Sequence, residues 1–269
     1  MTAALLAIAM DLLVGLNGTS ATPAWASFAN PAFMRSLRLR LIGEILRNVR
    51  EVAASDVRVY HLAAPSWRIH PDQLATFSPR RLREALRTEL IRTGKLDELS
   101  GWLICFFHCD YDQRTGLLEP HFHIVVVGEK YRAIEALRTL NLFAGGDHGE
   151  IRRPIVCQAV NNPARQIPYL LKGYWQAIGS YVDATTGRPR RAPIKRRLPE
   201  PLGAQVLLFL HRQTFADMIW LHNIALVDGQ FKPKEPVMLK VAQARQRIGK
   251  QPRHARPSRG RRGSRGSRP

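Results

Sequence analysis

Several stretches of the chain alternate apolar and polar residues, the pattern of a β-strand with one buried face. The clearest is Val-Arg-Val-Tyr-His-Leu-Ala at residues 57–63. Two more apolar stretches, at 102–109 and 119–128, are separated by Asp-Gln-Arg-Thr-Gly, which favours a turn. We therefore expect these two to pair as an antiparallel hairpin. A fourth strand is expected at residues 153–160.

Between the expected strands, apolar residues recur at helical spacing. Five segments predict helices, at residues 34–54, 79–94, 130–140, 163–178 and 203–221. The second has clear end signals, because Ser78 precedes Pro79 as an N-cap and Gly94 follows the last apolar turn. From residue 57 to residue 178 the predicted order is therefore strand, helix, two strands, helix, strand and helix.

This order predicts an α+β fold with a central antiparallel sheet, RRM-like or ferredoxin-like, and helices packed on it. We expect four regions: an N-terminal helical extension (1–54), the core (55–180), a C-terminal helical extension (181–236) and a basic tail (237–269). The tail has no acidic residue and ends in Arg, Gly, Ser and Pro. That composition predicts disorder.

The motif His-Phe-His opens the second strand of the expected hairpin. Side chains two apart in a strand share a face, so His121 and His123 should project together. His108, on the neighbouring strand, offers a third imidazole, and Asp110 and Glu119 are alternative third ligands. Three such groups can bind a divalent cation and leave positions open for a substrate. The other interpretation is an ordinary strand whose histidines are satisfied by hydrogen bonds.

The helix expected after Pro163 carries Tyr169 and Lys172 three residues apart, on one face. A phenol becomes a useful nucleophile only when a neighbouring group stabilises its deprotonated form, and Lys172 is placed to do so. Tyr174 lies five residues beyond Tyr169, about 140° around a helix, so it is a reserve candidate. Taken alone, Tyr169 would be an ordinary half-buried aromatic residue.

Together these motifs resemble the HUH endonuclease superfamily, in particular the rolling-circle replication initiators of plasmids and phages. Three segments carry the resemblance: Trp-Leu-Ile-Cys-Phe-Phe-His-Cys-Asp at 102–110, Pro-His-Phe-His-Ile-Val-Val at 120–126 and Pro-Tyr-Leu-Leu-Lys-Gly at 168–173. The similarity covers about residues 56–176. The histidine motif is the more specific part, and the order of the two motifs strengthens the match.

The resemblance implies a metal-dependent enzyme that nicks and rejoins single-stranded DNA. His121, His123 and a third ligand, assigned to His108, would hold Mg²⁺ or Mn²⁺. Tyr169 would attack the scissile phosphate and form a 5′-phosphotyrosine link. Some members use two tyrosines, commonly one helical turn apart, and the spacing to Tyr174 departs from that pattern. Single-strand transposases and conjugative relaxases share this chemistry, but a relaxase usually carries its tyrosine ahead of the histidines.

The charge balance points to a polyanionic partner, because 41 Lys and Arg against 21 Asp and Glu give a net charge of +20. Single-stranded or origin DNA is the expected partner, and cationic grooves with aromatic residues bind it. We expect contacts from the basic residues near the motifs: Arg152, Arg153, Arg188, Arg190, Arg191, Lys195, Arg196 and Arg197. Residues 188–197 are expected to form an exposed loop. Without a Walker-type phosphate-binding motif in the sequence, a host helicase is a further expected partner.

Two other classes of function stay open. A non-catalytic nucleic-acid-binding protein on an RRM-like sheet would expose aromatic residues on the sheet face, where this chain has histidines. A zinc-stabilised structural protein lacks support from any cysteine–histidine spacing. The three cysteines are odd in number and indicate reduced thiols. The apolar run at residues 1–16 is too short to span a bilayer, so we expect a cytoplasmic protein without a membrane segment.

Overall fold

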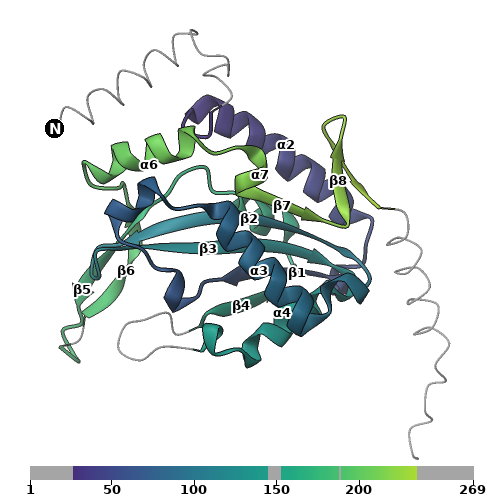
Figure 1. The fold of residues 1–269 in the computed structure, drawn as a ribbon, viewed down its shortest axis with the longest axis horizontal. Coiled ribbons are helices and arrows are strands. Elements are labelled where there is room, and N and C mark those ends of the chain that lie inside the picture. The colour runs from purple at the N-terminus through teal and green to yellow at the C-terminus, as the bar shows by residue number, and fades with distance from the viewer. Residues whose placement is uncertain (1–26, 145–152, 188, 235–269) are drawn as a thin grey trace, which may run out of the picture.

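A mixed sheet forms the centre of the molecule (Figure 1). The computed structural model describes residues 27–144, 153–187 and 189–234. Seven strands build the sheet: β1 (Val57–Leu62), β2 (Trp102–Asp112), β3 (Leu117–Val127), β4 (Ile155–Ala159), β5 (Ala177–Val182), β6 (Pro189–Arg196) and β7 (Ile219–His222). Their order is β4-β1-β3-β2-β5-β6, with β7 also paired to β2.

Helices and a small hairpin surround this sheet. The helices are α2 (Pro31–Arg50), α3 (Pro79–Gly94), α4 (Tyr131–Ala136), α5 (Pro163–Leu170), α6 (Leu202–His211) and α7 (Phe215–Met218). Strands β8 (Ile224–Val227) and β9 (Gln230–Pro233) form a separate hairpin. In β2 and β3 the side chains of both faces are buried, so the centre of the sheet is covered on both sides. The predicted α+β class is confirmed.

Much of the local structure follows the predicted pattern. β2 and β3 form the expected antiparallel hairpin, in a register that places His108 opposite His121. Helix α3 begins at Pro79, where the Ser78 hydroxyl accepts a hydrogen bond from the Arg81 amide at 3.3 Å. At the other end, Gly94 allows α3 to approach α4 closely, because a Cβ there would lie 2.4 Å from the Cα of Ala133.

The sheet is not wholly antiparallel as predicted, because β5 runs parallel to the end of β2. The helix predicted over residues 163–178 ends at Leu170, two residues after Pro168, and an irregular segment leads into β5. The backbone amide of Tyr111 donates to the carbonyl of Gln176 at 2.8 Å, so pairing with β2 replaces helix in this segment.

The C-terminal part of the chain differs most from prediction. Residues 188–197 were expected to be an exposed loop, but residues 189–196 form β6 and pair with β5. The helix predicted at 203–221 divides into α6 and α7 and ends in β7, which pairs with β2. The region 181–236 is therefore strand-rich as well as helical, and two of its strands join the main sheet. The tail at 237–269 lies outside the described residues, and no described helix is long and apolar enough to cross a membrane.

Candidate functional site

Four histidines from three neighbouring strands share one face of the sheet. In the antiparallel register, His61 on β1 lies opposite His123 on β3, and His108 on β2 lies opposite His121 on β3. Opposite residues project to the same face. The ring centroids of His61 and His121 are 4.6 Å apart, and those of His108 and His121 are 5.0 Å apart. The cluster is a compact group of imidazoles on three neighbouring strands of the sheet.

The described residues contain two trios of possible metal ligands. Within each trio, the ligand atoms lie within 4.8 Å of one another. One comprises His61, His121 and His123, and the other comprises His108, Asp110 and His121. His121 belongs to both trios. Of the other two predicted ligands, His123 belongs to the first trio and His108 to the second. His61 was missed by the sequence reasoning. The sequence shows a histidine within the predicted strand at 57–63, but it does not show which strand pairs with that one.

Hydrogen bonds to backbone carbonyls fix the tautomers of two histidines. His108 Nε2 lies 3.1 Å from the carbonyl oxygen of Tyr174, and His121 Nδ1 lies 2.9 Å from that of Glu119. A carbonyl only accepts, so each of these nitrogens carries the proton and the other ring nitrogen keeps its lone pair. Metal-binding histidines are commonly held in this way.

Several buried polar atoms of the cluster have no hydrogen-bond partner among the described residues. They are both ring nitrogens of His123, Nδ1 of His108 and Oδ1 of Asp110. Buried polar atoms usually have a partner, and a bound cation would supply one for these atoms. The donor set therefore fits a divalent cation.

Burial keeps these imidazoles neutral. It lowers the pKa of His61 to about 3 and that of His121 to about 4. The pKa values of His108 and His123 also lie well below the usual value, first because of burial and then because of the neighbouring His121. Burial would raise the pKa of Asp110, but His108, His121 and Lys195 outweigh it and the net shift is downward. The site thus offers neutral imidazoles and an ionised carboxylate, the forms that bind metals.

Tyr169 lies at the edge of the cluster, near the end of α5. Its side chain is 59% exposed, and its ring centroid is 6.1 Å from that of His123. Lys172 follows the helix end and places its ammonium nitrogen 4.4 Å from the centre of the Tyr169 ring. Burial lowers the pKa of Lys172 to about 8, with Asp110 opposing and Lys195 adding to that shift. Tyr169, Lys172 and the histidines therefore come together.

Tyr174 has a different place. Its side chain is 63% exposed, and its described contact with the cluster is made by the backbone carbonyl that accepts from His108. The ring contacts of the histidines include Tyr169 and not Tyr174 in the described part of the chain.

Two of the residues predicted to contact DNA, Arg191 and Lys195, pair with carboxylates of the protein. Arg191 lies 3.0 Å from Oδ2 of the fully buried Asp112 and 2.5 Å from Oε1 of Glu119, and Lys195 forms an ion pair with Asp110. Glu119 also pairs with Arg68 at 2.9 Å, which occupies the carboxylate that was an alternative metal ligand. β6 therefore supplies counter-charges to three buried carboxylates at one end of the β2–β3 hairpin.

The other basic residues predicted to contact DNA are dispersed. Arg190 pairs with Asp183 at 2.6 Å. Arg153, Arg196 and Arg197 are exposed, and Arg152 and Arg188 lie outside the described residues.

Comparison of the chain with models of protein families, with curated proteins and with solved structures gave no match.

Proposed function

We propose that the protein is a metal-dependent endonuclease that nicks and rejoins single-stranded DNA through Tyr169. The observation that carries this proposal is the contact between Tyr169 and His123, which places an exposed phenol beside a buried group of neutral imidazoles. The resemblance to the HUH endonucleases rests on these same residues.

We propose further that strands β1 to β4, with α3 and α4, form a ferredoxin-like core. Their connectivity, β-α-β-β-α-β, and their order, β4-β1-β3-β2, support this assignment. β5 and β7 are then additions to β2, the strand at the edge of that core, and β6 pairs with β5. Three of the four histidines then lie on the two central strands of that core, β1 and β3, and His108 lies on β2.

The histidine-rich donor set favours Mn²⁺ over Mg²⁺, which prefers oxygen ligands. The residues that would hold the cation are His121 with either His61 and His123 or His108 and Asp110. When bound, a divalent cation would polarise a phosphodiester and stabilise the charge that develops during displacement.

The side chains of Tyr169 and Lys172 would carry out the other steps of strand cleavage. The Tyr169 hydroxyl forms a bond to the 5′-phosphate while the bond from phosphorus to the 3′-oxygen breaks. The phenol loses its proton to solvent, and the departing 3′-oxygen takes one up and becomes a hydroxyl. The ammonium of Lys172 over the Tyr169 ring stabilises the phenolate as it forms. The phosphotyrosine conserves the bond for rejoining.

Replication initiation is the process we favour over conjugative mobilisation, because Tyr169 follows the histidines in the sequence. A host helicase and a cytoplasmic location belong to this proposal. The net charge of +20 supports a DNA substrate.

A covalent-adduct assay tests the function. The protein is incubated with a labelled single-stranded DNA library of random sequence and Mn²⁺ or Mg²⁺, and the products are separated under denaturing conditions. We expect a protein–DNA adduct that EDTA abolishes. If no adduct forms with any divalent metal, the proposed function is wrong.

A further inference from the structure

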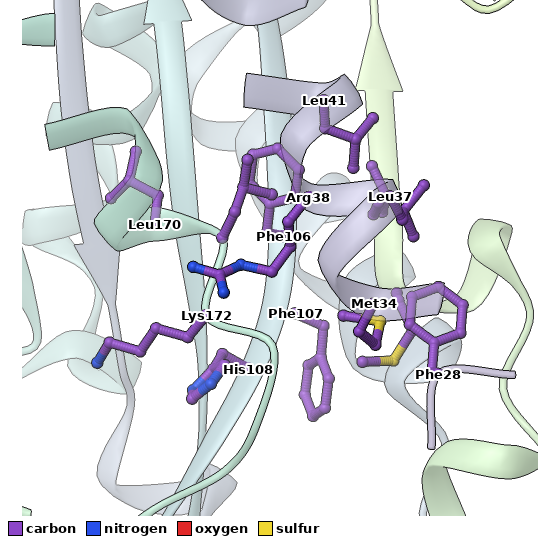
Figure 2. A pocket seen from close by; sticks show the side chains of 13 residues that line it. Phe28, Met34, Leu37, Arg38, Leu41, Phe106, Phe107, His108, Leu170 and Lys172 are labelled. Atoms are coloured by element: carbon purple, nitrogen blue, oxygen red, sulfur yellow. The ribbon is translucent and has the colours of Figure 1, made fainter. Parts of the chain in front are cut away.

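Helix α2 lies outside the segment that carries the motifs, yet it places an arginine beside them. The side chain of Arg38 is half-buried and points from α2 toward the chain that carries Leu170 and Lys172 (Figure 2). Its guanidinium donates to the carbonyl oxygen of Pro168 at 3.4 Å. Gly173 leaves room for it, since a Cβ there would lie 3.1 Å from Cδ of Arg38. Arg38 therefore reaches the backbone immediately before Tyr169.

Arg38 and Lys172 line one cavity together with His108. The remaining walls are apolar, formed by residues such as Leu37, Leu41, Phe106 and Leu170 (Figure 2). No described carboxylate oxygen lies within 4.0 Å of either cation, and Nε of Arg38 is buried without a hydrogen-bond partner among the described residues. By contrast, Lys195 and Arg191 each pair with a buried carboxylate.

Placing a half-buried cation against an apolar wall costs free energy unless an anion accompanies it. Asp110 offsets part of that cost for Lys172, and Arg38 has no such described partner. A guanidinium matches a phosphate in shape and can donate two parallel hydrogen bonds to it. Lys172 supplies a point charge at the same cavity. The arrangement suits a phosphodiester lying over the cavity mouth, next to Tyr169.

The position of α2 is itself fixed by the C-terminal hairpin. The amide of Phe231 on β9 donates to Glu44 at 2.8 Å, and its carbonyl accepts from Asn48 at 3.1 Å. Glu44 and Asn48 lie about two and about three turns beyond Arg38 on the same helix. The hairpin thus holds in place the helix that presents the arginine.

We propose that Arg38 binds a backbone phosphate of single-stranded DNA adjacent to the phosphodiester that Tyr169 attacks, with Lys172 as the second cation. This inference rests on the proposed function for the identity of the anion. It assigns part of the DNA site to a helix that the sequence motifs do not include.

Metal-free binding of a labelled single-stranded oligonucleotide tests the proposal, because EDTA removes any contribution from strand cleavage. The variants are Arg38→Gln, Arg38→Lys and the matched control Arg35→Gln, an exposed arginine on the same helix. We expect Arg38→Gln to weaken binding about tenfold and to lower the slope of log affinity against log salt by about 0.7, the value of one phosphate contact. Arg38→Lys should be intermediate, and Arg35→Gln should bind within about twofold of the original chain.

Thermal unfolding of each variant shows whether α2 stays folded, and adduct formation is measured in parallel. Weaker binding by Arg38→Gln at an unchanged melting temperature supports the phosphate site, even if the original chain forms no adduct and the proposed function fails. Binding and salt dependence equal to those of Arg35→Gln overturn it. If Arg38→Gln binds normally and only its adduct formation is slow, Arg38 acts by positioning Tyr169 and the phosphate site is wrong.

Discussion

The ring of Tyr169 meets the ring of His123 edge to face, with centroids 6.1 Å apart and planes inclined at 74°. This contact joins the exposed end of α5 to the buried histidine cluster. We therefore predict that Tyr169→Phe forms no covalent adduct with single-stranded DNA, while it still binds the DNA. Removal of a covalent nucleophile typically lowers the rate by several orders of magnitude. Denaturing electrophoresis of the adduct measures the effect.

Tyr174→Phe is the matched control, because it removes a similarly exposed hydroxyl close in sequence. Its backbone carbonyl, which accepts from His108, is unaffected by the substitution. We expect an adduct yield within about twofold of the original chain. Loss of the adduct in Tyr174→Phe with retention in Tyr169→Phe would mean that the nucleophile is Tyr174.

His61 should be a metal ligand. The trio of His61, His121 and His123 contains three neutral imidazoles, and both nitrogens of His123 lack a partner in the described part of the protein. In the other trio, Asp110 is already paired with Lys195. We predict that His61→Ala lowers the affinity for Mn²⁺ by at least about tenfold, and that His108→Ala lowers it less. Isothermal titration calorimetry measures both.

The controls for this prediction are His121→Ala and His70→Ala. His121 belongs to both trios, so its loss should weaken binding at least as much as the loss of His61. His70 is exposed and belongs to neither trio, so its replacement should leave the affinity unchanged. A larger loss in His108→Ala than in His61→Ala would assign the cation to His108, Asp110 and His121 instead.

The parts of the fold that depend on nearby residues were predictable. The turn after Asp112 and the apolar strands on either side define the β2–β3 hairpin, and with it the pairing of His108 with His121. The ends of α3 are likewise predictable from Ser78, which caps its first turn, and from Gly94, which is its last residue and precedes the C-cap Lys95. Each depends on interactions within a few residues or across a short turn.

The parts that depend on long-range pairing were not predictable. His61 joins the cluster because β1 pairs with β3, more than fifty residues away in the chain. The basic residues and prolines at 188–197 predict a solvated loop, but Asp110 and Asp112 lie buried within reach of Lys195 and Arg191. Nothing local marks those carboxylates as partners, because β6 reaches them only through β5, which pairs with the distant strand β2.

Stability should depend on pH through His222. Burial lowers the pKa of this histidine to about 4, and Lys130, Arg87 and Lys234 act in the same direction while Asp97 opposes them. The unfolded chain, with a pKa of about 6.5, then binds a proton that the folded chain does not. The resulting stability is complete above about pH 6.5 and is lost as the pH falls toward 4.

We predict that His222→Gln reduces the loss of unfolding free energy between pH 7.5 and pH 5 by about 2 kcal/mol. Urea denaturation at a series of pH values, compared with the original chain and with His70→Gln, measures this difference. A pH profile of His222→Gln that parallels the original chain would show that His222 titrates near its ordinary value in the folded protein.

The ion pair of Lys195 with Asp110 should stabilise the fold as well as the site. Asp110 is almost fully buried, so Lys195→Met would leave a carboxylate there without its closest cation. Loss of one partner of a buried pair typically costs about 3 kcal/mol, and we expect that loss in urea denaturation. Arg196→Met removes the neighbouring exposed cation and should change stability by less than about 0.5 kcal/mol.

The double variant Asp110→Asn/Lys195→Met separates the ion pair from other effects of the lysine. Replacing the carboxylate with an amide removes the unpaired charge, so the double variant should recover most of the stability that Lys195→Met loses. It should also bind Mn²⁺ with nearly the original affinity, because the predicted ligands His61, His121 and His123 are intact. If the double variant is no more stable than Lys195→Met, then Lys195 contributes through packing of its side chain and not through the charge of Asp110.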